Sequence, residues 1–284
     1  MKHVRDWFGA NPLRPAIASI VAILVLGGAA NMLSPPQMER DWYPYLSHTP
    51  EVEMTATGFS VSPVSDWSYA WGAETDTTYL DAVSYDFDQL RGVWFMLEPQ
   101  PGSQLAAHTL LLFEFEGDRL LGVTIEARRE QGEDYSALHG QFNAFELIYI
   151  WASARDLLVR RAVMLDHDVF VYPVSITDEQ NRTLLARLLQ RSDELSRTPR
   201  YYNTILSNCT NELAKAAGFH WAPAYVLTGR SDEYLFRRGI IRGESFARAH
   251  ARADVTEFVQ ALNQVSPRAF DRVLLEELRR RNAG

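Results

Sequence analysis

The run His108-Thr-Leu-Leu-Leu-Phe-Glu-Phe115, the turn Glu116-Gly-Asp118 and the run Leu120-Leu-Gly-Val-Thr-Ile-Glu-Ala-Arg128 together decide the fold. Two apolar, β-rich runs on either side of a short turn with a glycine predict a hairpin of two buried strands. The chain reverses at Gly117, so the simplest pairing sets His108 opposite Glu126. The hairpin is therefore expected to bring an imidazole and a carboxylate together at one end of its strands.

Further strands are predicted on both sides of the hairpin. Alternating apolar residues indicate one or two strands in 51–71, a strand at 94–98 and another at 168–174. Two segments stay ambiguous, since 85–90 fits a loop or a short helix and 142–151 fits a helix or a strand.

The C-terminal half is predicted to be mainly helical. Thr177 or Asp178 caps a helix over residues 178–196, and its apolar face consists of four leucines, Leu184, Leu185, Leu188 and Leu189. Helices with Arg-rich faces follow from Asp232 onward. Strands followed by helices predict an α+β fold, with a mainly antiparallel sheet packed with helices.

Residues 201–218 contain the single cysteine of the 284-residue chain. Ser207 and Asn208 are both good N-cap residues and Gly218 is a plausible C-cap, so Cys209 is expected at a helix N-terminus. The unpaired backbone N–H groups and the helix dipole there favour a thiolate and could hold an oxyanion. A lone cysteine is also often an inert, buried apolar residue.

A nucleophilic thiol needs a base and a group that orients the base. His108 opens a buried strand and faces Glu126, which would fix the imidazole and stabilise its charged form. Five other histidines lie in polar or loop-like settings that favour surface positions: His48, His139, His167, His220 and His250. A strand-edge histidine and a solvated carboxylate remain the alternative interpretation of the pair.

Four more polar residues are weaker candidates for substrate or oxyanion contacts. Asn203 and Asn208 could donate to an oxyanion, although turn and capping roles explain both. Arg128 could bind a phosphate or carboxylate, or form a structural ion pair. Tyr149 could line the cleft, although aromatic residues in such runs usually belong to the core.

The N-terminus indicates the topology. Basic Lys2, Arg5 and Arg14 precede an uncharged apolar run over residues 16–33, which has about the minimum length of a membrane span. We expect residues 1–15 in the cytoplasm and a transmembrane anchor at 16–33. Cleavage of a signal peptide near Gly27 is the alternative.

The rest of the chain is expected outside the cytoplasm, in three parts. These are a tether over residues 34–50, a catalytic domain over 51–229 and a C-terminal helical extension over 230–284. The whole chain carries a formal −8 and the first 33 residues carry +2, which leaves −10 for the remainder. That charge argues against nucleic acid as a partner and makes the bilayer, reached through the anchor, the expected one. No metal-ligand spacing or phosphate loop is present, so we expect no metal and no cofactor.

Several motifs occur in an order that resembles one known family. They are His108-Thr-Leu-Leu-Leu-Phe-Glu-Phe, Thr124-Ile-Glu-Ala-Arg-Arg-Glu, Phe145-Glu-Leu-Ile-Tyr-Ile, Val169-Phe-Val-Tyr, Tyr202-Asn and Asn208-Cys-Thr. They resemble the periplasmic-domain family of the bacterial lipoprotein N-acyltransferase Lnb, over roughly residues 55 to 220. That family is similar to circularly permuted papain-like thiol enzymes.

The resemblance implies Cys209 as nucleophile, His108 as general base and Glu126 as the orienting group. It also implies a single-pass protein of the inner (cytoplasmic) membrane with most of its chain in the periplasm, a phospholipid acyl donor and a lipoprotein N-terminus as acceptor. No run after Leu33 is apolar and long enough to span a membrane, so we expect the membrane bundle of full acyltransferases to be missing. A papain-like cell-wall peptidase or amidase and a non-catalytic envelope scaffold remain the alternatives.

Overall fold

The computed structural model describes Pro15, Ser19 and residues 34–283. Apart from Pro15 and Ser19, the expected cytoplasmic segment 1–15 and the expected anchor 16–33 lie outside the described residues. In the part of the chain that the structure describes, no helix is both long enough and apolar enough to cross a membrane.

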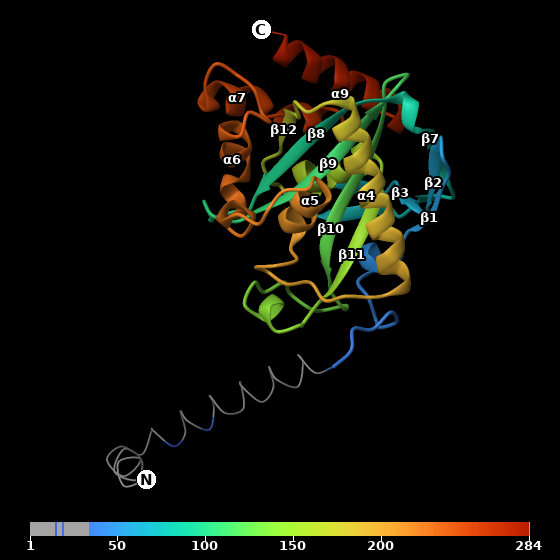
Figure 1. Cartoon of the computed structure of the whole chain (residues 1–284), viewed down its shortest axis with the longest axis vertical. Coiled ribbons are helices and arrows are strands. Elements are labelled where there is room, and N and C mark those ends of the chain that lie inside the picture. The colour runs from blue at the N-terminus through green and yellow to red at the C-terminus, as the bar shows by residue number, and fades with distance from the viewer. Residues whose placement is uncertain (1–14, 16–18, 20–33, 284) are drawn as a thin grey trace.

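The predicted hairpin forms the centre of a seven-stranded sheet (Figure 1). Its two strands are β9 (Ala107–Phe115) and β10 (Arg119–Arg128). The strand order is β12-β8-β9-β10-β11-β3-β6, and every neighbouring pair is antiparallel except β11 with β3. The other strands are β3 (Val64–Ser65), β6 (Tyr79–Leu80), β8 (Leu90–Pro99), β11 (Glu146–Ala152) and β12 (Phe170–Pro173).

The hairpin has the register that the sequence predicts. Phe115 pairs with Arg119 and Leu110 pairs with Thr124, so the strands fold symmetrically about Gly117. Gly117 and Asp118 both adopt positive φ angles, of 80° and 54°, which glycine and aspartate tolerate better than most residues. The turn therefore fixes which residues face each other at the far end of the hairpin.

Both faces of the sheet are covered by helices, which explains the nearly continuous apolar runs of β9 and β10. Leu111 and Phe113 face a core shared with α4 (Asp178–Arg197) and α5 (Cys209–Ala216). Leu110 and Leu112 face a second core, shared with helices on the opposite side. Figure 1 shows α4 and α5 lying across one side of the sheet. The helices of the opposite side are α3 (Ala154–Val159), α8 (Thr256–Ala261) and α9 (Pro267–Asn282).

Most of the predicted elements are present with small shifts in their ends. Helix α4 starts with a capping box between Thr177 and Gln180, and its four predicted leucines are buried. The ambiguous segment 142–151 contains strand β11, and 85–90 contains a short 3-10 helix, η2 (Phe87–Gln89). The described part is thus an α+β structure with antiparallel and mixed sheets.

Smaller elements surround the main sheet. One three-stranded sheet has the order β1-β2-β7, and β4 pairs with β5. These strands are β1 (Glu51–Met54), β2 (Gly58–Ser62), β4 (Ser68–Ala70), β5 (Ala73–Asp76) and β7 (Val83–Asp86). The remaining helical elements are η1 (Pro44–Leu46), η3 (His139–Gln141), η4 (Arg160–Met164), η5 (Pro223–Tyr225), η6 (Thr228–Arg230), α6 (Ser231–Arg237) and α7 (Phe246–Ala253).

Residues 34–50, expected to form a tether, lie against the main sheet. Trp42, Tyr45 and Leu46 are buried, and the guanidinium of Arg128 donates to the backbone oxygens of Leu46 and Ser47 at 2.8 and 2.7 Å. A tether would leave such aromatic side chains in water, whereas here their burial adds to the core.

The C-terminal helices, expected as an extension, complete the core on the α3 side of the sheet. Val259 of α8 and Phe270 and Leu274 of α9 are fully buried. Without them, Leu110 and Leu112 would lose much of their covering layer. Four of the five arginines of α9 are exposed, which is why the sequence shows an Arg-rich face.

Gly122 allows α3 to approach the sheet closely. A Cβ atom at this position would lie 2.2 Å from Leu157 Cδ1 of α3 and 2.9 Å from Leu112 Cδ2. Both leucines are fully buried, so neither side chain has free space to move into.

We therefore expect Gly122→Ala to lower the free energy of unfolding by about 1–3 kcal/mol, the usual cost of overpacking a core. Gly92→Ala, in strand β8 of the same sheet, is the matched control, because the atom nearest to its added Cβ would be 4.0 Å away. Urea denaturation of the two variants checks this. Equal stability of both variants would contradict the close packing of α3 on β10.

Candidate active site

Cys209 is the first residue of helix α5. Asn208 caps this helix, and its Oδ1 accepts a hydrogen bond from the Asn211 N–H at 2.8 Å. The thiol is largely buried and lies where the first N–H groups of the helix have no partner within the helix. The positive end of the helix dipole therefore acts directly on the sulfur.

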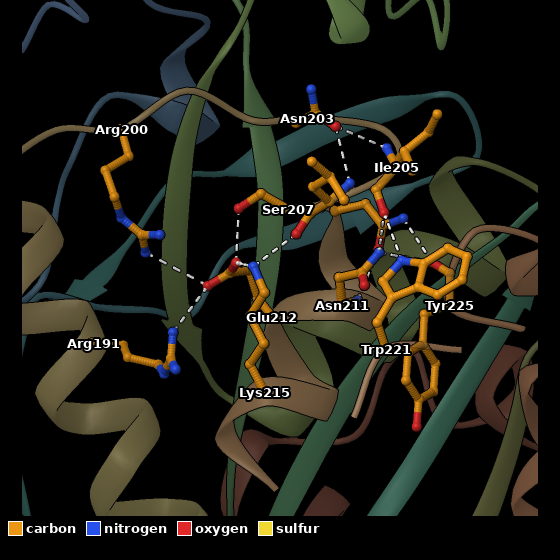
Figure 2. A network of polar contacts seen from close by, with 12 residues as sticks. Arg191, Arg200, Asn203, Ile205, Ser207, Asn211, Glu212, Lys215, Trp221 and Tyr225 are labelled. Carbon is orange, nitrogen blue, oxygen red and sulfur yellow. Dashed lines mark hydrogen bonds and ion pairs between the residues drawn. The ribbon is translucent and has the colours of Figure 1, made fainter. Parts of the chain in front are cut away.

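A buried carboxylate one turn further along α5 holds the helix in place (Figure 2). Glu212 is fully buried and accepts from Ser207 Oγ at 2.7 Å, Lys215 Nζ at 2.6 Å and Tyr149 OH at 3.0 Å. Arg191 and Arg200 reach the same carboxylate at 3.4 and 3.5 Å. These contacts lower the pKa of Glu212 against the effect of its burial, so it stays ionised.

The loop before Cys209 is also tied down by side-chain amides (Figure 2). Asn203 Oδ1 accepts from the backbone N–H groups of Ile205 and Leu206, at 3.1 and 2.9 Å. Asn208 Nδ2 donates to the backbone oxygens of Thr204 and Tyr225, both at 2.7 Å. The two asparagines proposed as oxyanion donors are therefore engaged in turn and capping contacts, and the structure does not direct either amide at the thiol.

His108 lies on β9 and contacts two residues of β10, Glu126, which the continued register sets opposite it, and Thr124, which pairs with Leu110. Its Nε2 is 2.6 Å from Thr124 Oγ1 and 3.1 Å from Glu126 Oε1. The Thr124 hydroxyl also donates to Glu126 Oε1 at 2.8 Å. These contacts fix the plane of the imidazole and leave Nδ1 as the nitrogen that can face the thiol.

An arginine from the same face of the sheet as His108 and Glu126 supports this pair. Arg161, on the π-helical turn η4 directly after α3, lies 2.7 Å from Glu98 Oε2 and 3.3 Å from Glu126 Oε1. Glu98 pairs with His108 across β8 and β9. His167 Nδ1 lies 2.6 Å from the other oxygen of Glu98. The carboxylates of Glu98 and Glu126 and the guanidinium of Arg161 therefore lie around the imidazole.

The thiol and the imidazole line the same cleft, and each shifts the pKa of the other. Burial opposes ionisation of Cys209, but the His108 imidazolium and a hydrogen bond from the Thr109 N–H outweigh it and lower the pKa of the thiol. Burial also opposes protonation of His108, yet the Glu126 carboxylate and Cys209 raise its pKa to about 10. The pKa of Glu126 is lowered despite burial, mainly by His108. Both shifts favour the charged pair, a thiolate beside an imidazolium, over the neutral pair.

These groups lie along a cleft of about 410 Å³. Cys209, His108 and Glu126 are all on its wall, as are aromatic and aliphatic side chains from distant segments. The latter include Tyr43, Tyr45, Leu46, Tyr135, Leu165, Tyr202 and Val226. Among the residues that the structure describes, no group of three or more His, Cys, Asp or Glu side chains is suited to hold a metal ion.

Besides Asn203, two candidates lie outside the wall of this cleft. Arg128 is buried, stacks over the Trp42 ring with its guanidinium carbon 4.3 Å from the centroid, and holds residues 34–50 against the sheet. Tyr149 lies in the core beneath α5 and donates to Glu212. Both side chains are therefore used for packing and for positioning other residues.

The sequence analysis missed Thr124, Glu98, Arg161 and His167. Thr124 and Glu98 are polar residues within otherwise apolar strands, and this pattern could have marked them as buried residues of the site. Arg161 gave no signal, because its place depends on the π-helical turn. His167 was expected on the surface, but its side chain is only 17% exposed and pairs with Glu98.

Comparison with protein-family models gives one match, the Lnb N-terminal periplasmic domain, over residues 78–232. The match covers more than half of the chain. The chain belongs to this family. Searches of curated proteins and of solved structures found no match. The family match includes Cys209, His108 and Glu126, whereas residues 34–50 and helices α7 to α9 lie outside it.

We expect the alkylation rate of Cys209 to reach half its maximum well below pH 8.5, the ordinary thiol pKa, because a lowered pKa keeps the thiolate present at lower pH. His108→Ala removes the imidazolium that favours the thiolate, whereas burial still favours the neutral thiol. The pH midpoint of the alkylation rate is therefore expected to rise to 8.5 or above. Rates with iodoacetamide across pH 5–10 measure this, with the exposed His220→Ala as control. Superimposable profiles of wild type and His108→Ala would contradict the pairing.

Glu212→Gln is expected to lower the free energy of unfolding by about 2–3 kcal/mol, since it leaves several donors without their charged acceptor. The exposed Glu244→Gln, which loses only an ion pair with Arg248, should change it by less than about 0.5 kcal/mol. Thermal and urea unfolding of both variants check this. A Glu212→Gln variant as stable as wild type would argue against this carboxylate as the anchor of α5.

Proposed function

We propose that this protein is a thiol enzyme of acyl-transfer type that works through a Cys209 thioester. The observation that carries the proposal is the thiol at the N-terminus of α5 beside the His108 imidazole, which is itself held by Glu126. A packing cysteine would not need a lowered pKa or a cleft. The thiol here has both.

The geometry supports a two-step reaction. The thiolate attacks an ester or amide carbonyl, and the S–C bond forms as the carbonyl oxygen takes the negative charge. The Cys209 backbone N–H and the dipole of α5 stabilise this oxyanion. When the C–O or C–N bond breaks, the leaving group takes the proton of the His108 imidazolium and a thioester remains.

The second step regenerates the thiolate. Neutral His108 accepts a proton from an attacking amine or water, the new C–N or C–O bond forms, and Cys209 leaves as the thiolate beside the imidazolium. Glu126 and Thr124 hold the ring for both transfers through Nε2. Arg161 keeps Glu126 ionised and in position.

A helix-borne thiol that follows a strand-borne imidazole in the chain is the order expected of a circularly permuted papain-like fold, and we propose that arrangement for this domain. We also propose a phospholipid as acyl donor and the amine of a lipoprotein N-terminus as acceptor, on the basis of the family. The apolar and aromatic part of the cleft wall favours an acyl group over a polar peptide. A cell-wall peptidase or amidase is the alternative that the experiment below separates.

The test is the intact mass of the full-length protein in detergent after incubation with phosphatidylethanolamine or phosphatidylglycerol. We expect a fatty-acyl mass increment on wild type that hydroxylamine removes, and no increment on Cys209→Ser or His108→Ala. The exposed His220→Ala should behave as wild type. If no increment forms with lipid, but a peptide ester leaves an acyl adduct on Cys209, the lipid substrate is wrong and the peptidase reading replaces it. No adduct with either would contradict the thiol enzyme.

A further inference from the structure

Four segments around the cleft contain no charged residue. They are residues 100–107, 135–145, 201–211 and 216–229, in which Asp, Glu, Lys and Arg are all absent although these make up 23% of the chain. Loops on a protein surface in water normally carry charges. The absence of charge in four separate segments at one place indicates that they do not face bulk water.

The same four segments expose large apolar side chains. Eight of the twelve exposed large apolar residues in the described part of the chain lie in them. Seven of these eight, which we call the rim, are Leu105, Leu138, Phe142, Ile205, Leu206, Trp221 and Leu227. Leu138 is 68% exposed and Leu206 is 60% exposed.

Each segment places a rim residue directly beside a residue of the cleft wall. The adjacent pairs, with the rim residue first, are Leu105 with Ala106, Leu138 with Ala137, Ile205 with Thr204, and Leu227 with Val226. The rim therefore surrounds the mouth of the cleft that holds Cys209. A molecule that leaves an apolar phase at the rim would reach the thiol without crossing water.

Hydrogen bonds between the segments make the rim one continuous surface. Thr204 Oγ1 donates to the Ala137 oxygen at 2.7 Å, and Trp221 Nε1 donates to the Ile205 oxygen at 3.2 Å. The Gly229 N–H donates to the Leu105 oxygen at 3.0 Å. Contiguous apolar surface of this kind marks an interaction site.

The chain enters the domain beside this surface. Tyr201, at the start of one uncharged segment, donates its hydroxyl to the Ser34 oxygen at 3.1 Å, and the Gln37 N–H donates to Glu146 Oε1 at 3.0 Å. Figure 1 shows the first described residues, in blue, at the same end of the molecule as the loop that contains η3. The apolar run 16–33 comes immediately before Ser34, so a membrane span there would bring the bilayer to this end of the domain.

The opposite end of the sheet has the surface expected in water. The hairpin turn there carries Glu116 and Asp118, which pair with Arg91 and Arg279 at 2.7 and 2.8 Å. About nine strand residues, or roughly 30 Å, separate this turn from His108. Charged residues therefore lie at the turn end of the hairpin, whereas the four uncharged segments lie at the His108 end.

We infer that the rim is a membrane-contacting surface, which dips into the outer leaflet next to the anchor and opens the Cys209 cleft to the lipid phase. Leu, Ile, Phe and Trp are the residues that insert at such a boundary, and charged residues are costly there. The inference rests on the rim and on its position beside the point where the chain enters the domain. It holds whatever reaction Cys209 performs.

The test uses full-length protein in phosphatidylcholine vesicles at one protein per several thousand lipids. Cys209→Ser removes the single native thiol, and Leu206→Cys, Leu138→Cys or Glu116→Cys then provides one site for the polarity-sensitive fluorophore NBD. The positions 206 and 138 lie in different loops of the rim, and 116 lies on the hairpin turn as the matched control. Lipids with a spin label on the acyl chain serve as quenchers.

We expect blue-shifted emission and several-fold stronger quenching at 206 and 138 than at 116, independent of protein density. Adding Leu227→Glu and Ile205→Glu to the labelled protein should weaken the quenching at 138. Equal, weak quenching at all three positions would overturn the inference. A blue shift at 206 and 138 without lipid quenching, or one that grows with protein density, would assign the rim to a second copy of the chain and would also overturn it.

Discussion

The register of the β9–β10 hairpin is the constraint on which the rest of the structure depends. Because both faces of the sheet are buried, a slip by one residue would move every large side chain of a strand to the wrong core. The same register sets His108 beside Thr124 and Glu126 on the face covered by α3 and η4. The force that folds the sheet, burial of apolar side chains, therefore also builds the imidazole and carboxylate pair.

The thiol comes from the opposite layer and needs a separate anchor. Helix α5 packs on the other face of the sheet, and its N-terminus reaches the sheet end only because Glu212 fixes the first turns with charged and hydroxyl donors. Thr109 links the two layers, since its backbone N–H reaches Cys209 and its hydroxyl lies 2.8 Å from that of Thr210. The wall of the resulting cleft is polar at Cys209, His108 and Glu126, whereas its mouth is lined by the apolar rim.

The sequence predicted the parts of this arrangement that depend on local pattern. Hairpin register follows from the position of Gly117, and the start of α5 follows from Asn208, so the identity and approximate place of His108, Glu126 and Cys209 could be inferred. The closeness of His108 to Cys209 could not be inferred from the sequence, because it depends on how α5 packs on the sheet. Arg161 was missed because its place depends on the π-helical turn η4. Residues 34–50 were expected to form a tether from their Pro and polar residues, and that composition gave no sign that Trp42 and Tyr45 would be buried against distant segments.

The thiolate absorbance near 240 nm shows most plainly whether Cys209 and His108 form a charged pair. The difference in absorbance between wild type and Cys209→Ser, followed from pH 4 to pH 10, reports the ionisation of this one thiol. We expect the thiolate of wild type to appear at a lower pH than 8.5, the ordinary thiol pKa, and His108→Ala to move its appearance to pH 8.5 or above. A wild-type transition at or above pH 8.5, unchanged in His108→Ala, would contradict it.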